Sequence, residues 1–166
     1  MDDTWTSIFA AAGWAIILGG AGGALTEIGP WYRQLKKPAW QPPDWLFGPA
    51  WTVILGLSGW SFYIGLTQAP RPEALAHIWG LFGVNFALHF AWSPLFFKFK
   101  RPDWALGENI VLWLSVLSLV VLLPRNIGNS FAGWLNVPYL VWVSFALVLN
   151  WKIVQLNRPF GRAAAV

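Results

Sequence analysis

The chain contains no cysteine and very little charge. The first absence excludes disulfides, thiolate catalysis, cysteine-ligated zinc and iron–sulfur clusters. Charged residues make up 11% of the chain, against about 25% in soluble domains. Hydrophobic residues make up 57%, more than a soluble protein of this length could hide, because its exterior would still need polar cover. The composition therefore favours a chain that is solvated by lipid.

Enzyme motifs are absent as well. The sequence has no Gly-rich phosphate loop, no HExxH, no GxSxG and no pair of carboxylates inside an apolar run. Its acidic residues lie almost entirely at the ends of the runs, whereas an ion-coupled pump carries charge at mid-membrane. We therefore expect no proton-driven transport, no metal site and no required cofactor.

Five long apolar runs are present instead. A spanning helix needs roughly 20 apolar residues, and barrel strands alternate, which these runs do not. The sequence predicts an all-α integral membrane bundle of five transmembrane helices in one domain, 1–166, with an ordered loop between helices 1 and 2. The predicted helices are 5–25, 46–68, 74–97, 105–123 and 131–153.

Local signals mark where these helices begin and end. Asp44 can cap the second helix, Pro124 should close the fourth, and Asn129 or Ser130 can cap the fifth. Two further prolines fall inside predicted helices and should kink them. They are Pro94 and Pro138.

The net charge of +4 comes from short basic clusters between the runs, which indicates membrane topology and no nucleic-acid partner. Five spans put two basic residues, Arg71 and Arg125, on the side of the N-terminus. The positive-inside rule then places loop 1, loop 3 and the C-terminus in the cytoplasm and the N-terminus opposite, and we expect a bacterial membrane. The nine basic residues of the cytoplasmic side are Arg33, Lys36, Lys37, Lys98, Lys100, Arg101, Lys152, Arg158 and Arg162.

Small residues recur every four positions in the first and third predicted helices. This spacing lets helix backbones approach closely in lipid. We interpret the stripe of the third helix as the seam of a homodimer; packing within one bundle is the alternative. The stripes are Ala11, Ala15, Gly19 and Gly23 in the first helix, and Gly83, Ala87 and Ala91 in the third.

The chain has 14 tryptophans, and twelve of them fall into two kinds. Those near span ends are typical of interfacial belts, whereas an indole N–H deep in lipid needs a partner and so can line a pocket. The belt candidates are Trp5, Trp31, Trp40, Trp45, Trp104, Trp134 and Trp151. The pocket candidates are Trp51, Trp60, Trp92, Trp113 and Trp142.

Helical spacing places polar and aromatic residues on common faces, which we expect to turn inward around a small-molecule cavity. The faces are Trp51, Leu55 and Ser58 in the second helix, Asn85, His89, Trp92 and Phe96 in the third, and Tyr139, Trp142, Ala146 and Asn150 in the fifth. A buried histidine can ligate haem iron, but no second ligand is evident. We therefore predict that His89 is satisfied by a hydrogen bond to a neighbour.

The loop between the first two helices is rich in aromatic residues and proline. Proline lowers the entropy of a loop, so we expect this one to be ordered and to cover the mouth of the bundle as a lid. Anchoring at the membrane interface is the alternative. The predicted lid residues are Trp31, Lys37, Pro38, Trp40, Pro42 and Pro43.

This loop also carries a resemblance. It reads Trp31-Tyr32, then Leu35-x-Lys37-Pro38-x-Trp40-x-Pro42-Pro43-x-Trp45 and Pro49-x-Trp51. Supporting elements follow in Trp92 with Phe96-Phe97, Pro138-Tyr139 with Trp142, Leu149-Asn150 and Leu156-Asn157. The chain resembles the TspO/MBR family, the tryptophan-rich sensory proteins and the mitochondrial translocator protein, over nearly its whole length.

The resemblance implies a five-helix bundle, usually homodimeric, that binds tetrapyrroles such as protoporphyrin IX, and in some members steroids or synthetic ligands. The implied pocket residues are Tyr32, Trp51, Trp92, Trp142 and Ala146. Together with the faces above, the predicted ligand-binding set is Tyr32, Trp51, Leu55, His89, Trp92, Phe96, Trp142 and Ala146.

Two departures from the family pattern are evident. His89 stands where the family usually has Asn, and Trp151 stands where the proposed cholesterol motif has Tyr, so steroid binding is only weakly supported. Three functions stay open: a sensor or translocator of porphyrins, an enzyme that degrades porphyrin with light and oxygen, and a structural protein. For the enzyme, Trp51 and Trp142 are the candidate catalytic residues.

Overall fold

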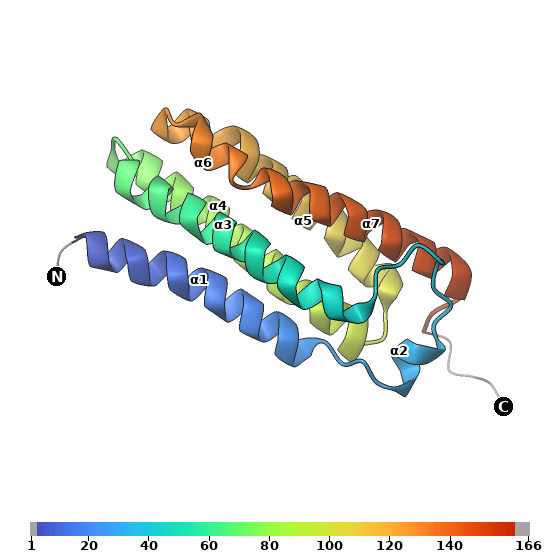
Figure 1. Ribbon diagram of the computed structural model, residues 1–166. Coiled ribbons are helices and arrows are strands. Elements are labelled where there is room, and N and C mark those ends of the chain that lie inside the picture. The colour runs from blue at the N-terminus through green and yellow to red at the C-terminus, as the bar shows by residue number, and fades with distance from the viewer. Residues whose placement is uncertain (1–2, 162–166) are drawn as a thin grey trace.

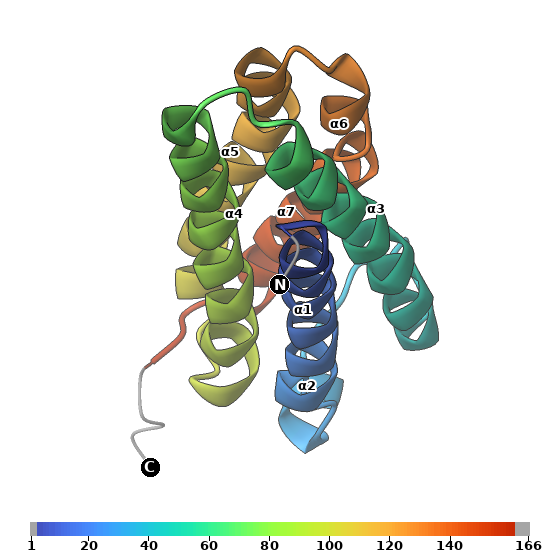
Figure 2. The same ribbon diagram turned by 90° about the vertical axis from the view of Figure 1, so that its left-hand side faces the viewer.

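The structure is a computed structural model that describes residues 3–161. Five long helices lie side by side along one axis (Figures 1 and 2). Each is long and apolar enough to cross a membrane, so the predicted five-helix membrane bundle is confirmed. The helices are α1 (Asp3–Leu25), α2 (Pro30–Gln34), α3 (Phe47–Gln68), α4 (Pro72–Ser93), α5 (Pro102–Ile127), α6 (Ser130–Trp134) and α7 (Val137–Asn157).

The fifth predicted helix is not continuous, which corrects the predicted range 131–153. It divides into α6 and α7, separated by Leu135 and Asn136. Pro138 therefore lies in the first turn of α7 and does not kink the interior of a helix. A proline is tolerated in a first turn because its missing N–H would have no partner there. Asn129 caps α6, since its side chain accepts a hydrogen bond from the Phe131 N–H.

One other predicted boundary is also wrong. Helix α5 continues through Pro124 to Ile127 and ends where Gly128 adopts a left-handed conformation, φ 71°. Pro94 ends α4, and the chain continues as a π-helical turn, Pro94–Lys98. Asp44 begins a 3-10 turn, Asp44–Leu46, but its side chain makes no capping hydrogen bond. The Asp44 carboxylate accepts a hydrogen bond from the Tyr32 hydroxyl and none from a backbone N–H at the start of the helix.

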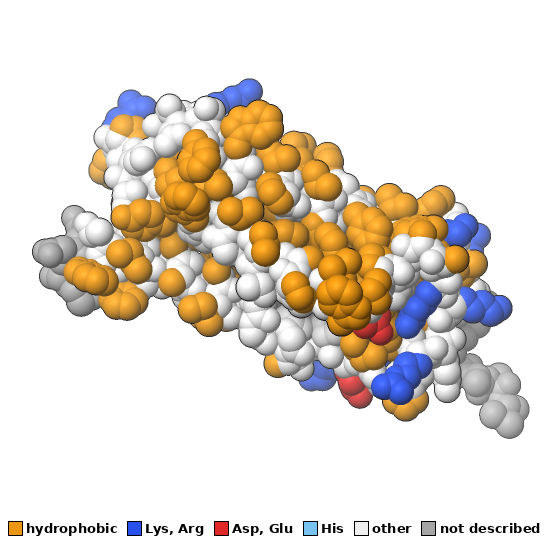
Figure 3. Space-filling model, in the orientation of Figure 1, with side chains coloured by type: hydrophobic (Ala, Val, Ile, Leu, Met, Phe, Trp, Pro, Cys, Tyr) orange, Lys and Arg blue, Asp and Glu red, His pale blue; other side chains and the backbone are white. Residues whose placement is uncertain are grey.

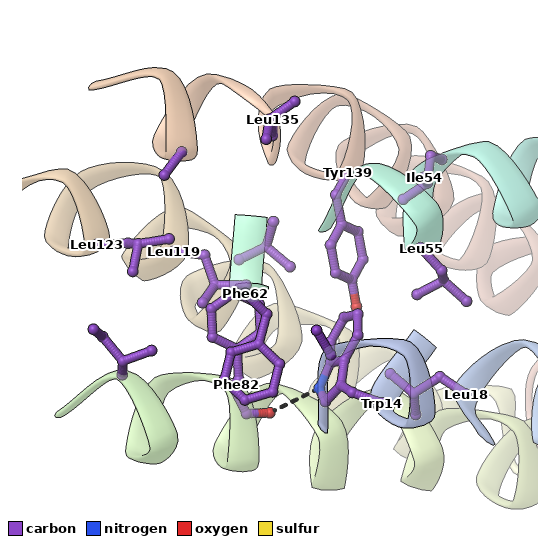
Figure 4. Packing of buried hydrophobic residues seen from close by; sticks show 14 of the residues in the cluster. Trp14, Leu18, Ile54, Leu55, Phe62, Phe82, Leu119, Leu123, Leu135 and Tyr139 are labelled. Atoms are coloured by element: carbon purple, nitrogen blue, oxygen red, sulfur yellow. Dashed lines mark hydrogen bonds between the residues drawn. The ribbon is translucent and has the colours of Figure 1, made fainter. Parts of the chain in front are cut away.

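A tightly packed aromatic core fills the bundle on the N-terminal side of its centre (Figure 4). The rings of Phe62 and Phe82 stack 4.2 Å apart. Trp14 stands edge-on to both and donates its indole N–H to the Phe82 carbonyl at 3.1 Å. This contact joins α1 to α4 and gives Trp14 a structural role that the helical pattern alone did not predict.

The two stripes of small residues have different surroundings. In α1, Ala11 and Ala15 pack against α3, where a Cβ on Gly59 would lie 3.1 Å from the Ala15 Cβ. In α4, Gly83 and Ala87 are exposed on the outside of the bundle. The stripe of α1 therefore packs within the bundle, while that of α4 faces the surroundings.

Charged side chains lie toward the ends of the bundle, and a broad apolar surface lies between them (Figure 3). The end that holds α2 and the last turns of α7 also holds the loop between α4 and α5 (Figure 1). All the basic residues assigned to the cytoplasmic side belong to this end, except Arg162, which lies outside the described residues. This distribution fits a multi-pass protein with a hydrocarbon-facing belt.

Candidate functional site

A cavity of about 500 Å³ opens inside the bundle toward the end that holds α2. Residues of α1, α3, α4, α5 and α7 form its wall, and the loop between α1 and α3 borders it. The structure brings all eight predicted ligand-binding residues to this one wall. They are Tyr32, Trp51, Leu55, His89, Trp92, Phe96, Trp142 and Ala146.

Trp51 is the central ring of the cavity wall. Its ring centroid lies 4.7 Å from that of His89, 5.8 Å from that of Tyr139 and 6.2 Å from that of Trp142, each nearly perpendicular to it. Edge-to-face contacts of this kind hold aromatic rings in fixed orientations. The two candidate catalytic tryptophans, Trp51 and Trp142, are thus direct neighbours from α3 and α7.

Four polar groups of the wall have no hydrogen-bond partner within the described chain, and one of them is the Gln41 side-chain oxygen at the mouth. The indole N–H groups of Trp92 and Trp142 are shielded from solvent without an acceptor, and the Asn109 Oδ1 is shielded without a donor. An unpaired buried polar atom costs about 1–3 kcal/mol. Such groups are rare in folded proteins, and around a cavity they indicate positions at which a ligand can supply the missing partner.

Part of the wall is formed by glycines of α1. Gly19, Gly22 and Gly23 all border the cavity, and a Cβ on Gly22 or Gly23 would meet nothing within 4 Å. The cavity thus extends up to bare backbone on this side. Here the α1 stripe serves a function other than helix packing, which its sequence spacing did not reveal.

The loop closes the mouth of the cavity through a polar cluster. Tyr32 donates its hydroxyl to Asp44 at 3.2 Å, and Gln41 donates its side-chain amide to the Tyr32 oxygen at 3.1 Å. Burial, and then the Asp44 carboxylate, raise the pKa of Tyr32 to about 12. The phenol therefore keeps its proton, and its bond to Asp44, throughout the physiological pH range.

The residues predicted to form the lid surround this cluster. The Lys37 ammonium lies 3.5 Å from the centre of the Tyr32 ring, and burial there lowers its pKa. Trp31 packs edge-on against Phe96 from outside, and Trp40 packs against Phe145. From this loop, Tyr32, Gln41 and Asp44 border the cavity. None of the six predicted lid residues does: Trp31, Lys37, Pro38, Trp40, Pro42 and Pro43.

A second contact ties the loop to the end of α7. The Lys36 N–H donates to the Asn157 side-chain oxygen at 2.8 Å, and the Asn157 side-chain amide donates back to the Lys36 carbonyl at 2.8 Å. This two-bond pairing joins positions far apart in the sequence. It fixes the loop over the cavity mouth independently of the Tyr32 cluster.

Substitution Asn157→Ala should release the loop. The loss of two hydrogen bonds, about 1 kcal/mol each, should raise the fraction of molecules whose loop is detached from α7 by roughly tenfold or more. Because cleavage follows the open population, trypsin should cut after Lys36 about tenfold faster in detergent. Asn126→Ala is the matched control, since Asn126 bonds only the Leu122 carbonyl of its own helix. Equal cleavage rates in the two variants would contradict a fastened loop.

His89 borders the cavity and is held in place by Tyr139, a residue that does not border it. Its Nδ1 lies 2.7 Å from the Tyr139 hydroxyl, which in turn donates to the Asn85 side-chain oxygen at 3.3 Å. The predicted hydrogen bond of His89 to a neighbour is therefore confirmed. Asn85 and Tyr139 were expected on the cavity faces, but they lie behind His89 and do not border the cavity.

Several other predicted residues also lie elsewhere. Trp60 follows Trp51 by about two and a half turns, so it points outward and is 53% exposed. Trp113 donates its indole N–H to Ser144, and Ser58 is buried against Asn136. Conversely, Asn109 borders the cavity and was missed. A polar residue within an apolar run was the signal that could have identified it.

Among residues 3–161, no group of three or more His, Asp or Glu side chains is placed to hold a metal ion. The cavity wall carries one charged side chain, Asp44, at the mouth. The rest is aromatic, aliphatic or neutral polar. Such a lining suits a largely apolar small molecule with a few hydrogen-bonding groups.

Comparison with known proteins agrees with this architecture. The sequence model of the TspO/MBR family matches residues 6–156. A "Tryptophan-rich protein TspO" of Chlorobaculum tepidum is 35% identical over 147 residues, which cover 87% of this chain and 92% of the relative. "Protein CrtK" of Rhodobacter capsulatus is 34% identical, covering 91% and 93%. The human "Translocator protein" is 32% identical, covering 76% and 75%. This five-helix, multi-pass membrane protein belongs to the TspO/MBR family.

Proposed function

We propose that this protein is a membrane receptor or translocator that binds porphyrins and similar flat amphipaths in the cavity beneath the loop. The observation that carries the proposal is an apolar, aromatic cavity whose wall includes two tryptophans, Trp92 and Trp142, with buried indole N–H groups that have no acceptor in the described chain. A tetrapyrrole offers a broad ring for stacking and polar atoms at its edge. The family names "sensory protein" and "translocator protein" support the receptor role.

Size and shape support the same class of ligand. A volume of about 500 Å³ lies within the roughly 300–1,000 Å³ that small-molecule sites occupy. Trp92 and Phe96 stack 5.1 Å apart, nearly parallel, which gives a flat surface against which a ring can lie. In another part of the wall, the glycines of α1 leave room for the edge of a large planar ligand.

The test is a titration of the purified protein with protoporphyrin IX in detergent. We expect saturable quenching of tryptophan fluorescence. The double variant Trp92→Phe/Trp142→Phe keeps the apolar wall but removes both donors, so affinity should fall about tenfold or more, from two bonds worth about 1 kcal/mol each. The matched control, Trp45→Phe/Trp134→Phe, changes two outward-facing tryptophans that are 71% and 68% exposed. Equal losses in both double variants would refute the site.

Illumination of the same complex separates receptor from enzyme. Trp51 and Trp142 are neighbours on the wall, so a bound porphyrin that sensitises oxygen would lie against them. A new chromophore that forms in light and disappears in Trp51→Phe or Trp142→Phe would establish degradation. Binding that is unchanged by light supports the receptor, which the absence of catalytic motifs favours.

Orientation and assembly complete the proposal. The end with the loop carries eight of the described basic residues and the opposite end carries Arg71 and Arg125, so the mouth should face the cytoplasm. The outward stripe of Gly83, Ala87 and Ala91 on α4 is the proposed seam of a homodimer. Cross-linking of single cysteines placed at these positions tests the seam.

A further inference from the structure

A directed chain of hydrogen bonds runs through the bundle and ends at the cavity. Ser115 donates its hydroxyl to the Leu112 carbonyl at 2.7 Å, so its oxygen is left to accept. It accepts from the Asn85 side-chain amide at 2.9 Å. That bond orients the amide of Asn85 and leaves its oxygen as the acceptor for the Tyr139 hydroxyl at 3.3 Å.

This direction determines which nitrogen of His89 carries the proton. A tyrosine hydroxyl has one hydrogen. If Tyr139 gives it to Asn85, the Tyr139 oxygen must accept from the Nδ1–H of His89 across their 2.7 Å contact. The reverse arrangement would leave the fully buried Asn85 oxygen without a donor, at a cost of about 1–3 kcal/mol. Only the Nδ1–H tautomer satisfies every member of the chain.

The second ring nitrogen, Nε2, therefore carries a free lone pair. In the described part of the chain, His89 has no hydrogen bond besides the one at Nδ1, and its side chain borders the cavity. The Trp51 ring stands perpendicular to it, 4.7 Å away, and restricts its rotation. A neutral imidazole whose other nitrogen is held by a hydrogen bond is the arrangement that makes histidine a good ligand for a metal.

We infer that His89 is a specificity-determining residue of the cavity, which selects tetrapyrroles that carry a metal with an open axial position. The inference rests on the proposed function, since it presumes that tetrapyrroles enter the cavity. The Nε2 lone pair completes the coordination of the metal, and no bond is broken and no electron is transferred. Tyr139 is a positioning residue, because it holds the ring and its tautomer without touching the ligand.

Variants at position 89 separate this role from a structural one. In His89→Asn, the shorter amide can still donate to Tyr139 from near the Nδ1 position, but nothing replaces Nε2. His77→Asn is the matched control, because His77 is the other histidine of the chain and lies exposed near the start of α4. The affinity of each variant for metal-free protoporphyrin IX is its own reference, so a general effect of the substitution on the cavity cancels from the ratio of the two affinities.

The experiment compares zinc protoporphyrin IX with the metal-free ring, using the full chain in detergent. Zinc held by four ring nitrogens accepts one further ligand. We expect the wild type to bind the zinc form about tenfold more tightly and to shift its main absorption band to longer wavelength, as axial nitrogen ligation does. His89→Asn should abolish both the preference for the zinc form and the band shift, while His77→Asn should change neither.

A second variant tests the hydrogen bond between His89 and Tyr139. Tyr139→Phe removes the partner of Nδ1, and loss of such a partner typically weakens metal binding about 10- to 100-fold. Metal-free binding should be retained. Nitrogen NMR of labelled wild-type protein should show the Nδ1–H tautomer of His89, identified by comparison with His89→Asn.

The outcomes distinguish this inference from the proposed function. If neither pigment binds, the proposed function fails, and this inference fails with it. If both pigments bind equally and without a spectral shift, the cavity takes tetrapyrroles but His89 does not select them. A shift that persists in His89→Asn, or an Nε2–H tautomer in the NMR spectrum, would likewise overturn the inference.

Discussion

Replacing Gly133 with alanine should destabilise the bundle more than any other single methyl addition at a described glycine. A Cβ at this position would lie 2.5 Å from the Pro124 Cγ and 2.6 Å from the Val120 carbonyl oxygen. The carbonyl belongs to the backbone of α5 and cannot move without distorting that helix. We expect a loss of about 3 kcal/mol in the free energy of unfolding, or about 10 °C in the melting temperature in detergent.

The reason lies in the proline of α5. Pro124 has no N–H to donate to the carbonyl four residues earlier, that of Val120. The glycine allows α6 to approach this carbonyl directly. Gly107→Ala is the control: it lies in α5, where a Cβ would meet nothing within 4 Å, and alanine favours helix there. Equal melting temperatures for the two variants would show that α6 does not pack as described.

The substitution Asn136→Leu should have the second largest effect. The Asn136 side chain accepts from the Ser58 hydroxyl at 2.7 Å, and donates to the Ser61 hydroxyl at 2.7 Å and to the Ala132 carbonyl at 3.0 Å. All of these groups are buried between α3 and the break that separates α6 from α7. Leucine has a similar volume but leaves Ser58 without its partner, so we expect a loss of about 2–3 kcal/mol.

Hydrogen exchange would localise this effect. Backbone amides around 132–140 should exchange faster in Asn136→Leu, while those of α1 should keep their protection, because the contacts between α1 and α3 are untouched. The control Asn126→Leu removes only a bond within one helix. Equal destabilisation by the two variants would mean that the buried network contributes little.

The fold was predictable from the sequence because lipid imposes a simple requirement. A helix that crosses hydrocarbon must be long, apolar and internally hydrogen-bonded, and each condition can be read from a single run of residues. The boundaries were less predictable. Pro124 and Pro138 both interrupt apolar runs, yet one is absorbed within α5 and the other marks a new helix. The difference depends on the contacts of Gly133 and Asn136, which join distant segments.

For the cavity too, features within one helix were predictable, and features that depend on contacts between helices were not. Helical spacing correctly grouped His89, Trp92 and Phe96, because residues on one face of one helix stay together whatever the packing. The spacing could not show how each helix is rotated about its own axis, and so which part of a face meets the cavity. It wrongly counted Ser58, Asn85 and Tyr139 toward the cavity and missed the glycine wall of α1. Those errors concern the rotation of a helix about its axis, which is set by its neighbours.

The position of α1 has a consequence for how the protein is made. This helix keeps much of its apolar surface outside the bundle, with Phe9 64% and Ile16 71% exposed. Its place in the bilayer is therefore stabilised by lipid more than by the other helices, as in the first step of two-stage membrane folding. Because α1 is synthesised before the other four spans, it can insert before they do. The later helices then pack against a helix that is already in the membrane.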